Sequence, residues 1–184
     1  MRYNCLAVAE QSLTKDMVTG RRVLETGSLD VTGDGGALEM RKWFMARGCG
    51  EYVGVDMNAG HGADVVCRIE DLVDRFGAES FDIIVSVDAA EHFEDWRECF
   101  SQMKRVCKPR GYILIATVTP GYGYHPFPED YWRWTAEDME RIFADCELVA
   151  LLPDLVGIAV RKPAEGFTET DLSGIELFRV EPPE

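Results

Sequence analysis

The run Phe81-Asp82-Ile83-Ile84-Val85-Ser86-Val87 decides the fold, because nearly all of its residues are apolar. A strand that is apolar at successive positions has both faces buried, and such strands lie inside parallel sheets covered by helices on both sides. The polar segment Asp88-Ala89-Ala90-Glu91-His92 follows it directly. The sequence therefore predicts an α/β protein with residues 81–87 as a central strand.

Short apolar runs alternate with helix-like segments on both sides of this strand. Strands are predicted at 22–25, 52–56, 63–67 and 112–118, and helices at 37–47, 92–107 and from Thr135 onward, where a capping threonine precedes an acidic first turn. Alternation of this kind is typical of a doubly wound, mostly parallel sheet.

The last two strands are expected to differ from the others. Residues 147–152 and 155–160 are separated only by Pro153-Asp154, which is too short for a helical crossover but can close an antiparallel hairpin. The prediction is a doubly wound, mostly parallel seven-stranded sheet with an antiparallel final hairpin. Residues 174–180 form a weak further strand candidate.

The chain is expected to form a single domain over residues 1–184. Residues 1–20 are predicted as a short N-terminal helix or arm, 21–162 as the core, and 163–184 as an acidic C-terminal tail.

The charge balance disfavours some classes of partner. The chain has 33 acidic and 19 basic residues and a net charge of −14, so its average surface repels nucleic acids and anionic membranes. It contains no apolar run long enough to span a membrane, and Glu10, Lys15 and Asp16 interrupt any signal peptide. A cytoplasmic location is expected.

Cysteine and histidine usage predicts neither disulfides nor a metal ion. The six cysteines form no CxxC pair, and the three histidines show no HExxH spacing. We therefore expect reduced thiols and no metal site built from neighbouring residues, while a site assembled by residues distant in sequence stays open.

The loops after the first four strands are the expected binding region, because ligands of doubly wound sheets bind beyond the carboxyl ends of the strands. A glycine-rich loop covers residues 25–36, Asp56 ends the second strand, and Arg68-Ile69-Glu70 follows the third. Glycine lets a ligand approach the backbone closely, and an acid at a strand end accepts hydrogen bonds from ribose hydroxyls. An apolar side chain packs on a flat ring. Together these loops predict a site for a nucleoside with a polar tail.

The order of these pieces resembles the class I S-adenosylmethionine-dependent methyltransferases from about Arg21 to Val160. The matching segments are VLETGS at 23–28, YVGVD at 52–56, FDIIVSVDAAEHFEDW at 81–96, KRVCKPRGYILIATV at 104–118, and the final hairpin. The resemblance implies S-adenosyl-L-methionine as cofactor. Its candidate binding residues are Glu25, Gly27, Ser28, Asp30, Asp56, Met57, Arg68, Ile69, Glu70 and Asp88.

The resemblance also implies a role for several of these residues. Glu25 and Gly27 would shape the methionine pocket, Asp56 would hold both ribose hydroxyls, and Ile69 would pack near adenine. Asp88 would lie near the methionine end, and Glu70 or Asp71 would accept the adenine amine.

The first loop departs from the family pattern of an acid followed by alternating glycines. Leu29 and Val31 occupy the positions of the second and third glycines. A methyltransferase subgroup reads G-S-x-D-V-x-G at this point, with a glycine-rich stretch before the third strand, and the segment from Gly60 to Val66 is similar. Cofactor binding with a rebuilt loop is the expectation.

The acceptor pocket is expected in the aromatic loop from Thr119 to Trp134. Substrate contacts are predicted at Tyr122, Tyr124, Tyr131, Trp132 and Arg133, and His92 and His125 are candidate catalytic bases. These groups suit a small polar or sugar-like acceptor methylated on oxygen or nitrogen. The N-P-P-Y or N-P-P-F tetrapeptide typical of nucleobase amino methylation is absent.

Two other function classes stay open. One is a non-catalytic methyltransferase-fold module that acts as a partner or regulatory subunit. The other is a nucleotide-binding oxidoreductase, against which stand the missing GxGxxG fingerprint and the final hairpin. The sequence leaves a homodimer or a partner subunit open as well.

Overall fold

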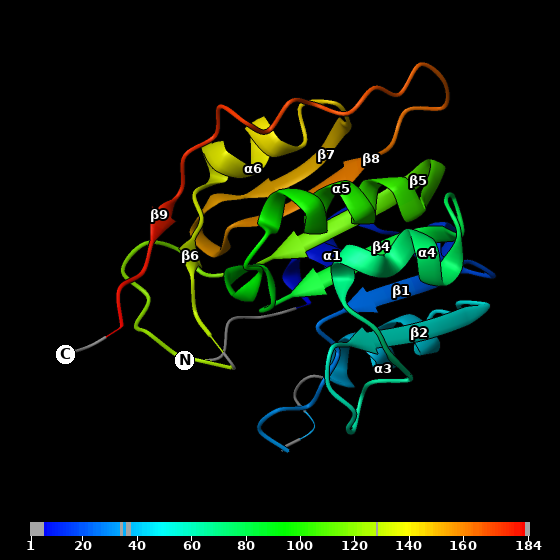
Figure 1. Cartoon of the computed structure of the whole chain (residues 1–184). Coiled ribbons are helices and arrows are strands. Elements are labelled where there is room, and N and C mark those ends of the chain that lie inside the picture. Colours follow the sequence, from blue (N-terminus) through cyan, green and yellow to red (C-terminus); the bar gives the residue numbers. More distant parts are fainter. Residues whose placement is uncertain (1–5, 34, 36–37, 128, 183–184) are drawn as a thin grey trace.

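A seven-stranded sheet lies between two layers of helices (Figure 1). The computed structural model describes residues 6–33, 35, 38–127 and 129–182. Within them the strand order is β3-β2-β1-β4-β5-β8-β7, and β6 pairs with β9 in a separate two-stranded ribbon. The predicted sheet architecture is confirmed.

The strands of the main sheet are β1 (Arg22–Thr26), β2 (Glu51–Asp56), β3 (Val65–Val66), β4 (Phe81–Val87), β5 (Cys107–Ala116), β7 (Glu147–Leu152) and β8 (Gly157–Arg161). The ribbon consists of β6 (Trp132–Arg133) and β9 (Phe178–Arg179). The helices are α1 (Ala7–Ser12), α2 (Lys15–Val18), α3 (Glu39–Ala46), α4 (Leu72–Phe76), α5 (Trp96–Val106) and α6 (Ala136–Ile142).

Strand directions agree with the sequence prediction. The pairs β1–β2, β1–β4, β2–β3 and β4–β5 are parallel, whereas β8 runs antiparallel to both β5 and β7. The change of winding direction lies between β1 and β4, because the chain leaves β1 toward β2 on one side and returns to β4 on the other. This is where a doubly wound sheet opens a crevice.

Several strand boundaries were predicted wrongly. β5 begins at Cys107 and not at Tyr112, because Cys107 already pairs with Phe81 of β4. The register shifts between Phe81 and Ile83, where Arg110 of the opposite strand has φ +64°. β3 is reduced to Val65–Val66. β8 begins at Gly157 because Pro153–Leu155 forms a 3-10 turn.

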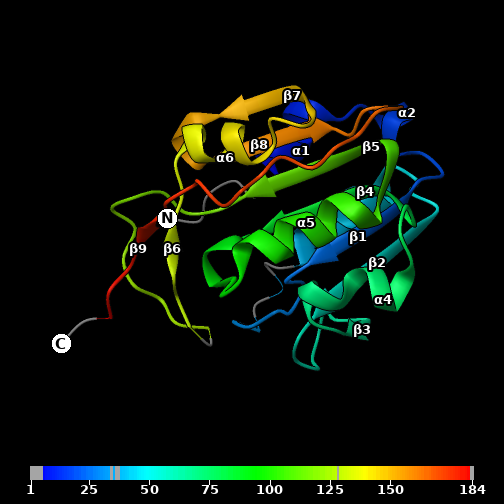
Figure 2. The same cartoon turned by 45° about the horizontal axis from the view of Figure 1, so that its top comes forward.

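The two faces of the sheet build two apolar cores. Leu24, Ile84 and Ile113 point to the face covered by α4, α5 and α6, and Val23, Ile83 and Leu114 point to the face covered by α1 and α3. Alternate residues of one strand therefore enter different cores, as a strand buried on both faces requires. Figure 2 shows helices α4, α5 and α6 on the near side of the sheet.

Helix α5 is shorter than the predicted helix of residues 92–107. Ala90–His92 forms a separate 3-10 turn, and α5 begins after Asp95, whose side chain accepts a hydrogen bond from the Glu98 N–H. Helix α6 begins at the predicted cap, where Thr135 and Asp138 form a reciprocal capping box. The short turn after β4 thus places Glu91 and His92 at the carboxyl edge of the sheet.

The tail is held against helix α5. The Arg97 guanidinium donates to the carbonyls of Leu172 and Ile175, and both of these residues are buried. Of the weak strand candidate at 174–180, only Phe178–Arg179 forms a strand. Figures 1 and 2 place the β6–β9 ribbon beyond the arrowheads of β4 and β5. The tail therefore closes back on the end of the sheet at which ligands are expected.

Helices that could cross a bilayer are absent from the described part of the chain, since none has both the required length and the required apolarity.

Candidate functional site

A cleft of about 410 Å³ opens at the carboxyl ends of β1, β2, β3 and β4. Nine predicted site residues line it: Gly27, Asp56, Met57, Arg68, Ile69, Glu70, Asp88, His92 and Tyr131. Lining residues that the sequence reasoning missed are Leu29, Val31, Asn58, Ala89, Phe93, Glu94, Cys99, Pro126, Phe127 and Glu129. The cleft thus joins loops from four strands with the aromatic loop after β5.

Gly27 and Ala89 bring the loops after β1 and β4 into direct contact at the point where the winding reverses. Gly27 has φ +69°, and a Cβ built on it would lie 2.4 Å from the Cβ of Ala89. An L side chain is thus excluded twice, by backbone conformation and by space. The narrow floor that results lets a ligand approach the backbone of both loops.

Asp56 ends β2 with its carboxylate fixed by two backbone groups. Oδ1 accepts from the Asn58 N–H at 2.9 Å and Oδ2 from the Leu29 N–H at 3.4 Å. A carboxylate oxygen has two lone pairs, so each retains one for a further donor. Two hydroxyls on adjacent carbons, as in a ribose, would satisfy them.

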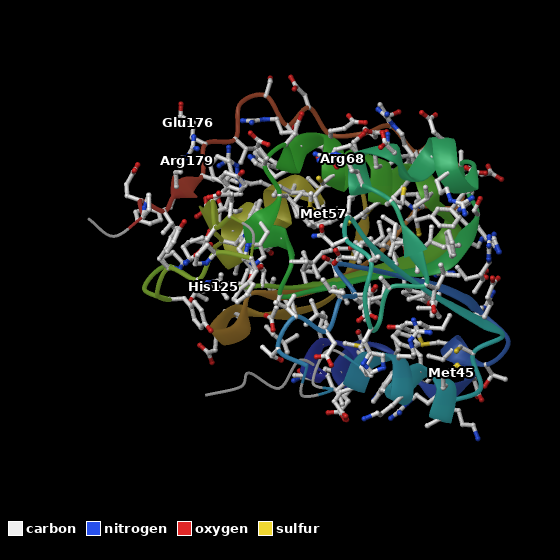
Figure 3. The ribbon with its side chains drawn as sticks, turned by 60° about the horizontal axis from the view of Figure 1, so that its bottom comes forward. Met45, Met57, Arg68, His125, Glu176 and Arg179 are labelled. Carbon is white, nitrogen blue, oxygen red and sulfur yellow. The ribbon has the colours of Figure 1, made fainter. Side chains whose placement is uncertain are left out.

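The far wall of the cleft combines an apolar surface with a charged pair. Ile69 and Met57 supply apolar atoms, while the Arg68 Nη2 donates to Glu70 Oε1 at 2.8 Å. In Figure 3, Met57 and Arg68 lie near each other, and His125 lies away from them. Met57 and Arg68 therefore lie in a different part of the site from His125.

The rebuilt first loop is packed under the glycine-rich segment after β2. A Cβ on Gly62 would lie 2.1 Å from the Ser28 carbonyl oxygen, and one on Gly60 would lie 2.4 Å from the Leu29 Cδ1. The Asp30 N–H donates to the His61 carbonyl at 2.8 Å. Because Gly60 and Gly62 have no side chains, they leave room for the Leu29 side chain and the Ser28 backbone of the first loop.

Ser28 and Asp30 are buried in this packing and do not line the cleft. Asp30 Oδ2 accepts from the Gly35 N–H at 2.9 Å. Their surroundings favour a structural role in shaping the loop over direct contact with a ligand.

Glu25 also lies below the cleft surface. It is 5% exposed, and burial raises the pKa of its carboxyl group to about 7, against the opposing influence of the Tyr52 hydroxyl and Arg41. Glu25 is not among the cleft-lining residues, so any effect on a ligand is exerted through the β1 loop above it.

His92 and His125, distant in sequence, come together beside the buried Glu91. Their rings meet edge to face with centroids 5.1 Å apart. His125 Nε2 lies 3.3 Å and His92 Nε2 3.9 Å from Glu91 Oε1. The hydrogen bond with Glu91 raises the pKa of His125 above its ordinary value. His92 lines the cleft directly, whereas His125 stands behind it.

The aromatic loop is divided among the cleft, the protein interior and the exposed surface. Tyr131 lines the cleft, whereas Tyr122, Tyr124, Trp132 and Arg133 do not. The Trp132 Nε1 donates to the Phe93 carbonyl at 2.6 Å, which ties the loop to the turn after β4.

Arg133 is 1% exposed and is held by Asp130 and by the carbonyls of Tyr122 and Gly123. Burial alone would raise the pKa of Asp130, but the Arg133 guanidinium and the His125 backbone N–H lower it. This arrangement favours a structural role for Arg133 over the predicted substrate contact.

Some of the missed lining residues had a signal in the sequence. Pro126, Phe127 and Glu129 belong to the predicted acceptor loop, in which the sequence singles out the tyrosines. Phe93 and Cys99 follow a helical apolar pattern, which indicates core packing and does not reveal which members border a cleft.

Comparison with protein families finds one match. Residues 29–115 match the model of a methyltransferase domain family, which spans the chain from the rebuilt first loop to the end of β5. Comparison with curated proteins finds no significant match.

Solved structures support the same fold. A Burkholderia thailandensis 1,6-didemethyltoxoflavin-N1-methyltransferase, solved with 1,6-didemethyltoxoflavin and S-adenosylhomocysteine, is 14% identical with a TM-score of 0.60, and the match covers 87% of this chain and 79% of that one. The [4+2]-cyclase SpnF is 15% identical with a TM-score of 0.62, with coverage of 88% and 80%.

A third match is to a complex of the Haloferax volcanii Trm112 methyltransferase activator with a methyltransferase, at 21% identity and a TM-score of 0.54, covering 77% of this chain and 65% of that chain. In a Mesorhizobium loti S-adenosylmethionine-dependent methyltransferase, the chain spans only 57% of the length. The sheet order is that of the class I S-adenosylmethionine-dependent methyltransferase fold, and residues 29–115 match the methyltransferase domain model.

Proposed function

We propose that the chain binds S-adenosylmethionine in the cleft and transfers its methyl group to an oxygen or nitrogen of a small polar acceptor. The observation that carries the proposal is the position of Asp56, whose carboxylate borders the same cleft as the narrow Gly27–Ala89 floor. An acid at the end of the second strand and close backbone approach after the first are what a nucleoside with a charged tail requires.

The polar groups of the cleft fit this cofactor in order along its length. Asp56 would accept the ribose hydroxyls, Ile69 would cover the adenine ring, and Glu70 would accept its amine through the oxygen that Arg68 leaves available. The methionine part would extend over Gly27 toward Asp88. Each of these residues lines the cleft.

The acceptor would enter from the side of the aromatic loop. Phe127 and Tyr131 offer ring faces there, and Glu129 and His92 offer polar groups. These side chains suit a molecule with both apolar and hydrogen-bonding surface, such as a sugar-like or heteroaromatic compound.

Catalysis would depend mainly on placement. The bound sulfonium supplies an electrophilic methyl group, and the protein holds the acceptor in line with it. Of the two candidate bases, His92 borders the cleft and would take the proton of the acceptor, while His125 would orient it from behind.

We also propose that the protein is cytoplasmic, that its partner is a small molecule and that it has no nucleic-acid substrate. The net charge of −14 supports the last point. A homodimer or a partner subunit that closes the acceptor side is part of the same proposal, because the cleft is bordered by exposed side chains such as Phe127 and Val31.

Isothermal titration calorimetry tests cofactor binding. We expect S-adenosylmethionine and S-adenosylhomocysteine to bind at micromolar concentration and NADPH not to bind. Asp56→Ala should raise Kd about 10- to 100-fold, since hydrogen bonds to a charged group contribute roughly 1.5–3 kcal/mol.

Asp74→Ala, on the exposed surface of α4, is the matched control and should bind as the wild type does. Binding of NADPH alone would favour the oxidoreductase alternative. Cofactor binding without turnover across an acceptor panel would favour the non-catalytic module.

A further inference from the structure

We propose that Glu91, His92 and His125 form a binding site for a divalent transition-metal ion of the Zn²⁺ class. Each residue offers one ligand atom, and the three atoms lie within 4.8 Å of one another. Neither the family match nor the cofactor cleft requires such a site, and it does not depend on the proposed methyl transfer.

The spacing of the three atoms is close to that of a metal coordination shell. Ligands at about 2.0–2.1 Å from a tetrahedral Zn²⁺ lie roughly 3.3 Å from one another. His125 Nε2 is 3.3 Å from Glu91 Oε1, and His92 Nε2 is 3.9 Å from it. The His92 ring would move closer to Glu91 to complete the geometry.

The outer ring nitrogens hold both imidazoles in the tautomer that a metal needs. His92 Nδ1 contacts the Glu129 carbonyl, and His125 Nδ1 lies 3.2 Å from the Gly123 carbonyl. A carbonyl oxygen only accepts, so each Nδ1 carries the proton and donates it. In the neutral rings the Nε2 lone pairs are then left facing Glu91, the arrangement typical of metal-binding histidines.

The carboxylate side is built in the same way. Glu91 is completely buried, and its Oε2 accepts from the Thr117 hydroxyl at 2.8 Å, so Oε1 is the oxygen that faces the histidines. Asp130 Oδ2 lies 3.1 Å from His125 Nδ1 and forms a carboxylate–histidine pair behind the ligand atom. A buried carboxylate is stabilised by a positive charge, and a metal ion would supply one.

The donor set selects the kind of ion. Two imidazoles and one carboxylate suit Zn²⁺, Fe²⁺ or Co²⁺, whereas Mg²⁺ and Ca²⁺ prefer oxygen donors only. Three protein ligands leave a coordination position open, as in metal sites that bind an exchangeable oxygen ligand. Because His92 also borders the cleft, an ion held by these residues would lie beside the cavity.

A simple ion pair is the competing interpretation. A doubly protonated His125 between Glu91 and Asp130 would also satisfy these contacts, and it would bind no metal. A bound ion would occupy the Nε2 lone pairs of His92 and His125. The metal-free and metal-loaded proteins would therefore use different groups to take a proton from an acceptor.

Zinc titration of chelator-treated protein at pH 8, in competition with a fluorescent zinc indicator, tests the site. We expect one Zn²⁺ per chain with micromolar or tighter affinity. His125→Ala and His92→Ala should each weaken binding roughly 100-fold. His61→Ala is the matched control, because the chain has only three histidines and His61 is an exposed one outside the cluster.

Cobalt substitution identifies the ligands. Bound Co²⁺ should show the visible bands of a nitrogen- and oxygen-ligated ion without the near-ultraviolet band of a cobalt thiolate. Absence of stoichiometric zinc binding, equal loss in His61→Ala, or a thiolate band would each overturn the proposal. Glu91→Gln is a third test of the zinc site, and circular dichroism shows whether this variant folds. If it does not fold, zinc binding by the two histidine variants decides whether the site exists.

Discussion

Arg133 holds both carboxylate oxygens of Asp130, Nη1 to Oδ1 at 2.6 Å and Nη2 to Oδ2 at 2.7 Å, in a place that solvent hardly reaches. A fork-to-fork pair of this kind is rigid as well as strong. It fixes the aromatic loop from within, so that Phe127 and Tyr131 are presented to the cleft by a loop with a buried polar anchor.

Arg133→Met should destabilise the protein by about 3–5 kcal/mol, because it leaves the Asp130 carboxylate buried without its partner. Urea unfolding measures the change. Lys42→Met is the control, since Lys42 pairs with Glu39 on the exposed surface of α3 and should cost less than about 1 kcal/mol. A loss as small as that of the control would mean that the buried pair contributes nothing to the loop.

Gly27→Ala should weaken cofactor binding and also reduce stability. The new Cβ would adopt an unfavourable φ, costing about 1–2 kcal/mol, and would collide with Ala89 in addition. Thermal unfolding and calorimetry with S-adenosylhomocysteine measure both effects.

Gly33→Ala separates the two causes, because Gly33 has a similar φ of +68° but nothing within 4 Å of its Cβ position. It should show the conformational cost alone. The double variant Gly27→Ala/Ala89→Gly should recover the part due to collision, and no recovery would show that the contact with Ala89 is not the cause.

Glu25 should make stability fall as pH rises through the neutral range. Its folded pKa of about 7 lies above its ordinary value of 4.5, so between these values the folded state binds more protons than the unfolded state. Stability from this group is present below pH 4.5 and declines by up to about 3 kcal/mol as the pH passes 7.

Glu25→Gln should remove this dependence, so that the variant gains stability relative to the wild type at pH 8 compared with pH 5. Urea unfolding at the two pH values gives the difference, in which contributions of other groups cancel. Glu39→Gln, on the exposed surface of α3, should show no such change. A parallel pH profile for Glu25→Gln and wild type would exclude Glu25 as the source.

Phe127→Ala should impair methyl transfer while leaving cofactor affinity and stability unchanged. The Phe127 side chain borders the cleft on the acceptor side and is 56% exposed, so its removal deletes contact surface without opening the core. Formation of S-adenosylhomocysteine across a panel of small hydroxyl and amine acceptors is the measurement.

Phe178→Ala is the control, because Phe178 is 62% exposed and lies in β9, outside the cleft lining. We expect KM for the acceptor to rise about tenfold in Phe127→Ala and to stay constant in Phe178→Ala. A weaker affinity for the cofactor in Phe127→Ala would place the ring over the cofactor and not over the acceptor.

Local sequence determined the sheet architecture and the residues at one end of the cleft. The apolar run of β4, the glycine after β1 and the acid ending β2 are features of single segments, and parallel strands bring their carboxyl ends to one edge whatever the loops do. This is why Gly27, Asp56, Ile69 and Asp88 could be predicted and all border the cleft.

The acceptor side depended on tertiary folding. The Asp130–Arg133 pair and the hydrogen bond from Trp132 to Phe93 decide which face of the aromatic loop turns inward. Because these contacts form only in the folded chain, the sequence did not distinguish the buried Arg133 from the cleft-lining Phe127. The meeting of His92 and His125 at Glu91 likewise has no local spacing that would reveal it. Strand edges are set by backbone pairing, whereas contacts between loops arise only when distant side chains compete for the same buried space.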